Sequence, residues 1–153
     1  RWIPEIKNII KETNTKSIID FGCGKALAYK QTINFNKIKY KNLKEFWDLN
    51  QITLYDPGVK QFNKYPQLKA DGIICTDVIE HITKEDVINF IEELYLLSNK
   101  FLFLVIATKP ASKFFEDGRN IHLTLKTKEE WGLIFEKFKL KFPDILTFVR
   151  YNE

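Results

Sequence analysis

A short glycine-rich turn follows the first segment of the chain that has the composition of a buried strand. Residues 17–19 are Ser-Ile-Ile, and the sequence Asp-Phe-Gly-Cys-Gly-Lys-Ala follows at positions 20–26. We expect a strand over about residues 17–21 and a helix over about residues 25–33. The two glycines permit a sharp turn close to a ligand, and the N–H groups of the next helix would face that ligand. Strand, glycine turn and helix together predict a binding loop of the kind that nucleotides occupy.

Two further segments place acidic residues at the ends of expected strands. Leu54-Tyr55-Asp56-Pro57 ends a strand expected over about residues 51–55. The segment 71–82 reads Asp-Gly-Ile-Ile-Cys-Thr-Asp-Val-Ile-Glu-His-Ile and contains a strand expected over about residues 72–76. Open α/β sheets bind ligands beyond the carboxyl ends of their strands. In the glycine turn, Asp20 precedes the first glycine, and its carboxylate suits a positively charged ligand group better than a pyrophosphate.

These three segments resemble, in the same order, motifs of class I S-adenosylmethionine (SAM)-dependent methyltransferases. The likeness covers residues 17–82 and is weaker toward the C-terminus; it is closest to small phage and bacterial members with an Asp-Val-Leu-Glu-His-like motif. The resemblance implies a Rossmann-like, three-layer α/β/α fold with a doubly wound, mostly parallel sheet. It also implies SAM as cofactor and S-adenosylhomocysteine as product.

The resemblance assigns cofactor-binding roles to individual residues. Asp20 would face the amino group of SAM, Asp56 would bind the ribose hydroxyls, and Tyr55 and Pro57 would flank the adenine. The full implied set is Asp20, Phe21, Gly22, Cys23, Gly24, Lys25, Tyr55, Asp56, Pro57, Thr76, Asp77 and Val78. Alternative roles are a turn cap for Asp20 and a turn-forming Asp before Pro for Asp56. Trp47 would either stack on the adenine or belong to the core.

Candidate catalytic residues come from two places. His81 follows the expected strand 72–76, and histidine is the side-chain type most suited to act as a general base near neutral pH, although a structural role is an alternative. A long loop over residues 107–123 contains Lys109, Arg119, Asn120 and His122. Long loops of this kind are often lids or binding loops, and the alternative is a mobile surface loop. The candidate catalytic set is His81, His122, Lys109 and Arg119.

The other expected elements form a single domain over residues 1–153. They are an amphipathic helix near residues 2–10, helices capped at Thr83 and Thr127, and strands over about residues 101–106 and 145–150. The space between Asp56 and Asp71 barely admits one crossover of about 10–12 residues. The third strand of the family is therefore expected to be reduced or missing. The longer interval before strand 51–55 predicts an inserted loop.

Composition narrows the range of partners. The net charge is +4, and Lys37, Lys39, Lys41 and Lys44 form the densest basic run. This run indicates either an anion or nucleic-acid patch or a solvated surface, and we favour the surface. The Asn/Asp-Pro-Pro-Tyr/Phe motif of nucleic-acid amino-methyltransferases and the Pro-Cys pair of cytosine-ring enzymes are both missing. A small-molecule acceptor is expected, while RNA methylation stays open.

Cysteine and hydrophobic patterns bear on metals and location. Cys23 and Cys75 are too few for a zinc ribbon or a disulfide scaffold, so we expect no metal site and two reduced thiols in a cytoplasmic protein. No apolar run reaches the ~20 residues of a membrane helix, so no membrane partner is expected. The chain contains no Met, which predicts trimmed ends and leaves a targeting segment open.

Three functions are compatible with the motifs. The first is methyl transfer from SAM to a small molecule. The second is a protein or subunit that binds SAM or S-adenosylhomocysteine without catalysis. The third is a dinucleotide-dependent oxidoreductase, but Asp20 before the first glycine and the long interval to Asp56 argue against it. The patterns do not specify the methyl acceptor or the oligomeric state.

Overall fold

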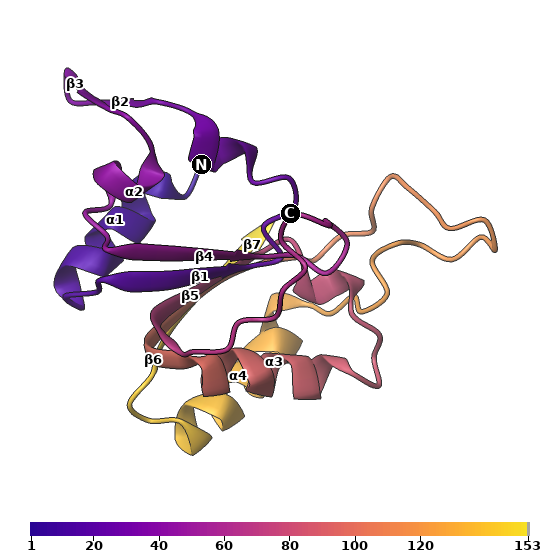
Figure 1. Cartoon of the computed structure of the whole chain (residues 1–153). Coiled ribbons are helices and arrows are strands. Elements are labelled where there is room, and N and C mark those ends of the chain that lie inside the picture. The colour runs from indigo at the N-terminus through magenta and orange to yellow at the C-terminus, as the bar shows by residue number, and fades with distance from the viewer. Residues whose placement is uncertain (153) are drawn as a thin grey trace.

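A computed structural model describes residues 1–152 and shows an α/β fold built on a five-stranded sheet (Figure 1). The strand order is β4-β1-β5-β6-β7, and every pair of neighbouring strands runs parallel. The strands are β1 (Ser17–Phe21), β4 (Gln51–Tyr55), β5 (Ala70–Thr76), β6 (Ser98–Ala107) and β7 (Leu146–Asn152). The predicted α/β class with a mostly parallel sheet is confirmed, and the five strands lie where the sequence places them.

Within the described residues, four α-helices cover the two faces of the sheet. Figure 1 shows α1 and α2 on one face and α3 and α4 on the other. Their bounds are α1 (Ile3–Glu12), α2 (Leu43–Phe46), α3 (Val87–Leu97) and α4 (Lys128–Lys141). None of these helices combines the length and apolar character that crossing a membrane requires. The arrangement gives three layers, with a hydrophobic core on each side of the sheet.

The interior strand β6, which lies between β5 and β7, contributes to both cores. Phe101 and Phe103 pack with α1 and α2, whereas Leu102 and Leu104 pack with α3 and α4. Successive side chains of a strand point to opposite faces, so an unbroken apolar run is what a strand covered on both faces needs. The sequence predicts this strand correctly because residues 101–107 contain no polar side chain.

Residues 56–69 join β4 to β5 through turns, and no strand lies between them in residues 1–152. The expectation that this segment holds no full strand is confirmed. Tyr65 instead folds back so that its ring contacts the rings of Phe21 and Tyr55, at centroid distances of 6.2 and 5.5 Å. As a result β4 is an edge strand, paired with β1 alone.

The predicted helix over residues 25–33 is wrong. The chain forms only a 3-10 turn, η1 (Leu27–Lys30), and then a two-stranded antiparallel sheet of β2 (Ile33–Phe35) and β3 (Ile38–Tyr40). Ala26 has a left-handed φ of 51° and breaks the helical path. Asn36 and Lys37, with φ of 49° and 64°, form a two-residue turn of the kind that suits a tight hairpin.

The hairpin and α2 account for the predicted insertion between β1 and β4. The rings of Phe35 and Tyr40 contact that of Phe46 in α2, at centroid distances of 5.3 and 5.0 Å. Lys37 and Lys39 of the basic run are exposed on the same hairpin. Alternation of apolar and polar residues over 33–40, with period two, is a hairpin signal that the sequence analysis did not use.

The two predicted helix caps differ in outcome. At α4 the Thr127 hydroxyl accepts from the Glu130 N–H, and the Glu130 carboxylate accepts from the Thr127 N–H, so this capping box is confirmed. The cap predicted at Thr83 is wrong, because α3 begins only at Val87. The Thr83 hydroxyl instead donates to the Asp86 carboxylate at 2.8 Å. A turn therefore separates the 3-10 helix η2 (Ile79–His81) from α3.

Replacing the two threonines by alanine should separate a helix cap from a surface hydrogen bond. We expect Thr127→Ala to lower the free energy of unfolding by about 1 kcal/mol, because the Glu130 N–H in the first turn of α4 loses its hydroxyl acceptor. Thr83→Ala should cost less than about 0.5 kcal/mol. Urea denaturation of both variants measures the difference, and equal losses would contradict the capping role of Thr127.

Candidate functional site

The carboxyl ends of β1, β4 and β5 meet at one edge of the sheet. β1 pairs with β4 on one side and with β5 on the other, and Asp20 lies in register with Leu54 and Ile74. The chain passes from β1 to β4 and then returns across β1 to β5, so the direction of winding changes at β1. Such a switch point is where open α/β sheets bind ligands.

The glycine turn after β1 is held by the end of β4. Gly22 has a φ of +88°, and the N–H groups of Gly22 and Cys23 both donate to the Tyr55 carbonyl, at 2.7 and 3.0 Å. The Gly24 N–H donates to the Asp56 carboxylate at 2.8 Å. The predicted turn is present, but the expectation that an α-helix begins behind it is wrong. The three N–H groups of the turn bind acceptors within the protein.

Asp56 joins three parts of the site. Its Oδ2 accepts from Gly24, its Oδ1 accepts from the Gly58 N–H at 2.9 Å, and its own N–H donates to the Phe62 carbonyl. The turn-forming role that the sequence left open is therefore present. A carboxylate has about four acceptor positions, so two protein donors leave room for further hydrogen bonds. The neighbouring Pro57 is exposed.

Asp20 is a buried acid beside the turn. Its Oδ2 accepts from the Tyr29 hydroxyl at 2.7 Å, and only 9% of the residue is exposed. Burial raises the pKa of Asp20 to about 6; the Tyr29 hydrogen bond opposes this shift, and the charge of Asp56 adds to it. Burial, with the charges of Asp20 and Asp56, raises the pKa of the Cys23 thiol to about 12. The surroundings of the turn therefore disfavour additional negative charge.

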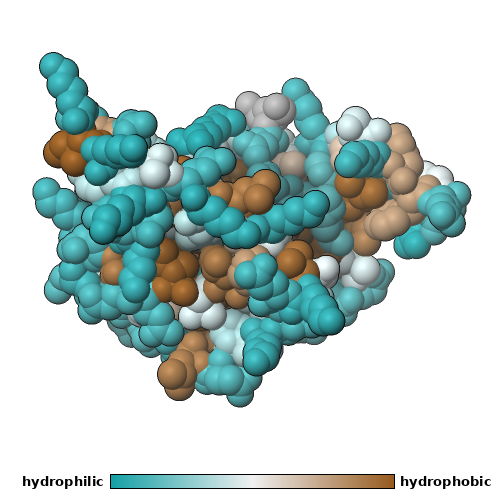
Figure 2. Space-filling model, turned by 45° about the horizontal axis from the view of Figure 1, so that its top comes forward, coloured by the Kyte–Doolittle hydropathy of each residue, from teal (hydrophilic) through white to brown (hydrophobic). Residues whose placement is uncertain are grey.

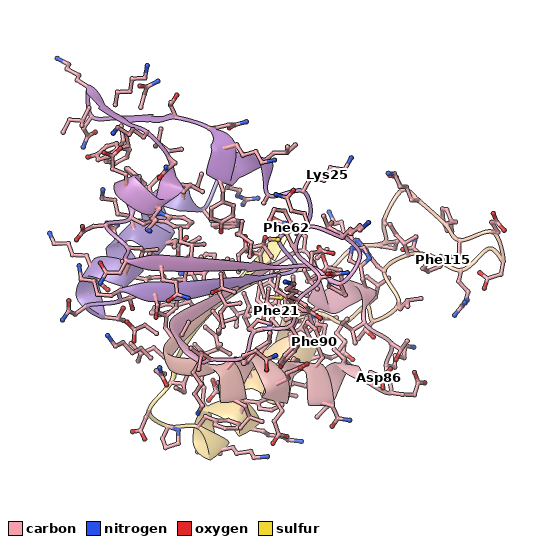
Figure 3. All side chains as sticks on the ribbon, in the orientation of Figure 1. Phe21, Lys25, Phe62, Asp86, Phe90 and Phe115 are labelled. Atoms are coloured by element: carbon pink, nitrogen blue, oxygen red, sulfur yellow. The ribbon has the colours of Figure 1, made fainter. Side chains whose placement is uncertain are left out.

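The aromatic residues of the predicted set pack among themselves. The ring of Phe21 lies 4.7 Å from that of Tyr55 and 5.6 Å from that of Phe90 in α3, and Figure 3 shows Phe21 and Phe90 together between the sheet and α3. Trp47 is buried, and its indole N–H donates to the Ile3 carbonyl, in accord with the core alternative. Lys25 is exposed on the turn.

The end of β5 contacts the same turn. A Cβ on Gly22 would lie 2.3 Å from Cγ2 of Val78, so glycine is what allows this close approach. Asp77 has a left-handed φ of 55° and accepts a hydrogen bond from the Asn152 side chain at 2.6 Å. The structure thus brings the predicted segments 20–25, 55–57 and 76–78 together.

The two histidines of the chain lie side by side, although they are far apart in sequence. Their ring centroids are 4.9 Å apart. His81 belongs to η2, and His122 lies in the loop that follows β6. Glu80, which the sequence analysis assigned no role, has a carboxylate oxygen within 4.8 Å of a ring nitrogen of each histidine. Burial raises the pKa of the Glu80 carboxyl, and the Ala107 N–H donates to its Oε1 at 3.1 Å. The position of Glu80 after an apolar strand and next to a histidine was the sequence signal that could have marked it as a functional residue.

The loop carrying His122 is folded onto itself. Asn120 accepts from the Ala111 N–H and donates to the Ala111 carbonyl, and a β-bridge pairs Phe114 with Asn120. Arg119 forms an ion pair with Asp117. Figure 2 shows apolar side chains on this projecting loop, where Phe114 and Phe115 are exposed.

The two cationic candidates of the loop do not share one place. Lys109 is exposed, and its carbonyl oxygen, 2.7 Å from Nδ1 of His122, contacts the histidine pair. Arg119 instead lies at the tip of the loop, where its guanidinium is 5.6 Å from the Phe115 ring centroid. Of the four candidate catalytic side chains, the structure therefore places only His81 and His122 in contact with each other.

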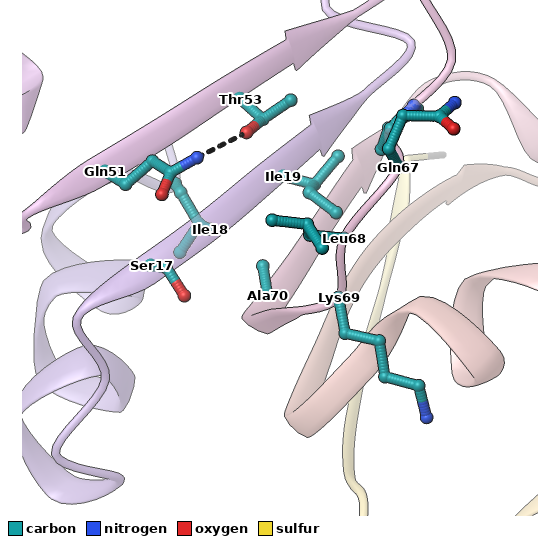
Figure 4. A pocket seen from close by; sticks show the side chains of 10 residues that line it. Ser17, Ile18, Ile19, Gln51, Thr53, Gln67, Leu68, Lys69 and Ala70 are labelled. Carbon is teal, nitrogen blue, oxygen red and sulfur yellow. Dashed lines mark hydrogen bonds between the residues drawn. The ribbon is translucent and has the colours of Figure 1, made fainter.

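Two cavities in the described structure differ in their distance from the carboxyl ends of the strands. A cavity of about 190 Å³ lies between the beginnings of β1 and β4 and the segment 66–70 (Figure 4). It is smaller than common ligand pockets and lies at the amino ends of the strands. An open hollow of about 590 Å³ is lined by His81, Thr83, Phe90 and Glu93. The hollow, and not the cavity, adjoins the histidine pair.

Comparisons with known proteins give no relative for this arrangement. No protein-family model, curated protein or solved structure matches the chain. A fold alone does not specify an activity. The function must therefore be argued from the chemistry of the carboxylates, the glycine turn and the histidine pair.

Alanine at the two glycines should test how tightly the turn is packed. Gly22→Ala introduces both backbone strain and the contact with Val78, and should lower the free energy of unfolding by about 2–4 kcal/mol. Gly24 has a φ of +54° but open space around it, so Gly24→Ala should cost about 1–2 kcal/mol. Chemical denaturation measures both. Val78→Ala should partly rescue Gly22→Ala, and no rescue would contradict the close contact.

Asp20 should make stability depend on pH. The raised pKa means that folded protein keeps a proton between pH 3.8 and about 6, where the unfolded chain has lost it. The free energy of unfolding should therefore fall as pH rises through this window, by up to about 3 kcal/mol. Urea denaturation from pH 4 to 8 should show a much weaker fall for Asp20→Asn. Parallel curves for the two proteins would contradict the assignment.

Proposed function

We propose that the chain is a class I, Rossmann-like, SAM-dependent methyltransferase that acts on a small molecule. The observation that carries the proposal is the hydrogen bond of Asp56 to Gly24, which joins the ends of β4 and β1 at the point where the winding of the sheet changes. A glycine turn and an acid on the neighbouring strand are the two features that a nucleoside-containing cofactor needs at such a point.

The residues present have the donor and acceptor types that SAM requires. Asp20 is a buried carboxylate with one protein donor, and its negative charge would be stabilised by the ammonium group of SAM. The acceptor positions left on Asp56 suit the ribose hydroxyls. Thr76, Asp77 and Val78 would border the cofactor from β5, and Tyr55 and Pro57 would flank the adenine.

When bound, SAM supplies a methyl group on a sulfonium leaving group, so the protein chiefly has to position the acceptor. His81 and His122 are the candidate groups for removing a proton from the acceptor. The two rings are in contact, and His81 also lines the open hollow of about 590 Å³. Lys109, whose carbonyl oxygen contacts His122, is the candidate contact for an anionic acceptor, while Arg119 is assigned no role.

One observation favours a second function, the binding of SAM or S-adenosylhomocysteine without catalysis. The N–H groups of Gly22, Cys23 and Gly24 already bind protein acceptors, whereas a cofactor loop commonly offers such groups to its ligand. A sensor or a subunit of a larger assembly would use the carboxylates alone. Methyl transfer from labelled SAM to an acceptor distinguishes the two functions, because a sensor transfers none.

Calorimetric titration with SAM, S-adenosylhomocysteine and NAD tests the cofactor assignment. We expect binding of the two adenosyl compounds and not of NAD. Asp56→Asn keeps the side-chain size but removes the charge, and should weaken SAM binding by about 1–3 kcal/mol.

The control for that titration is Asp117→Asn, which removes an exposed acid at the loop tip and should leave SAM affinity unchanged. Unchanged affinity in Asp56→Asn would refute the ribose assignment. Binding of NAD alone would refute the proposed function and favour an oxidoreductase.

A further inference from the structure

The chain contains two histidines, and both contribute to one cluster with Glu80. One nitrogen of His81, one nitrogen of His122 and one carboxylate oxygen of Glu80 all lie within 4.8 Å of one another. Glu80 and His81 come from η2, directly after β5, and His122 comes from the loop after β6. The sequence analysis expected no metal site because it considered only the two cysteines as ligands. The spacing of Glu80, His81 and His122 along the chain does not indicate that the three side chains lie together.

Each histidine ring uses one nitrogen for a hydrogen bond to a backbone carbonyl, which leaves its other nitrogen free to bind an ion. Nδ1 of His81 lies 2.9 Å from the Ile121 carbonyl, and Nδ1 of His122 lies 2.7 Å from the Lys109 carbonyl. A carbonyl oxygen only accepts, so each Nδ1 carries the proton when the ring is neutral. Nε2 of each ring then has a free lone pair. A histidine that donates to a backbone carbonyl while its other nitrogen binds an ion is the usual arrangement in metal sites.

Glu80 supplies an independent sign of a missing ligand. The residue is 1% exposed, and its Oε1 accepts from the Ala107 N–H. Its second oxygen, Oε2, is buried and has no hydrogen-bond partner in the protein. An unpaired buried polar atom of this kind is costly. A cation shared with two histidines would satisfy it.

We propose that Glu80, His81 and His122 form a binding site for a divalent first-row transition metal ion of the Zn²⁺ class. Two imidazoles and one carboxylate are a donor set that binds Zn²⁺, Fe²⁺ or Co²⁺. Three protein ligands leave at least one coordination position open, as in catalytic zinc sites. The open position would accept an oxygen or nitrogen ligand from solution. With the ion bound, the two imidazoles would not serve as proton acceptors in methyl transfer, so the two roles exclude each other.

The cluster is close to the size that such an ion needs. Ligands about 2.1 Å from one tetrahedral ion lie roughly 3.4 Å apart, so the widest pair here has to close by no more than about 1.4 Å. His81 and His122 are half-buried, and rotation of their rings supplies this movement. Buried Glu80 stays fixed while the two rings approach it.

The surrounding backbone positions the loop before any ion binds. Thr124 is fully buried; its N–H donates to the Glu80 carbonyl at 3.0 Å, and its hydroxyl donates to the Ile82 carbonyl at 2.7 Å. Asn120 accepts from the His122 N–H at 2.9 Å. These contacts tie both ends of the triad together, so little ordering remains for the ion to impose.

Metal titration of the full chain without a polyhistidine tag tests the site. Equilibrium dialysis against Zn²⁺, followed by elemental analysis, should give one ion per chain. Co²⁺ should give visible absorption bands typical of low coordination number. Glu80→Gln keeps the acceptor for Ala107, and His122→Ala changes a half-buried loop residue; each should weaken Zn²⁺ binding at least about 10-fold.

The controls separate this site from other donors. Cys23→Ser should leave Zn²⁺ binding unchanged, because the thiol is not part of the triad. Less than one ion bound to the wild-type chain, or His122→Ala binding as tightly as the wild type, would overturn the proposal. A loss of binding in Cys23→Ser would also overturn it. The titration needs no SAM, so its outcome does not depend on the proposed function.

Discussion

Seven consecutive residues of β6, Phe101 to Ala107, are buried on both faces of the sheet, and most of the structure follows from this requirement. Two hydrophobic cores are needed to cover them, and α1 and α2 supply one while α3 and α4 supply the other. A sheet covered in this way exposes its strand ends and not its faces. The candidate site accordingly lies at the edge where β1, β4 and β5 end.

Elements that depend on neighbouring residues were predicted from the sequence, whereas those that depend on turns or on the docking of a loop were not. Local signals, such as the unbroken apolar run of β6 and the capping box at Thr127, were predicted because neighbouring residues alone decide them. The segment after Gly24 was misassigned as a helix, since left-handed Ala26 and the Asn36–Lys37 turn outweigh its weak helical pattern. The meeting of His122 with Glu80 depends on how a long loop docks, which no local pattern encodes.

The edge of the sheet holds two clusters with different electrostatic character. Asp20 and Asp56 make the β1–β4 side acidic, and the pKa of Asp20 is raised as a result of its burial. On the other side of β1, the β5–β6 side offers two imidazole nitrogens and a single carboxylate. A cationic cofactor would suit the first cluster, and a metal ion with an exchangeable ligand would suit the second. The contact of Gly22 with Val78 joins the turns on which both depend.

The edge position of β4 has a consequence for the glycine turn. Both acceptors that hold the turn, the Tyr55 carbonyl and the Asp56 carboxylate, belong to the end of a strand that pairs with β1 alone. Edge strands open more readily than central ones. Fraying at the end of β4 would release the N–H groups of Gly22, Cys23 and Gly24 in one event. Amide hydrogen exchange at these three positions would then follow the local opening of β4 and not the unfolding of the whole sheet.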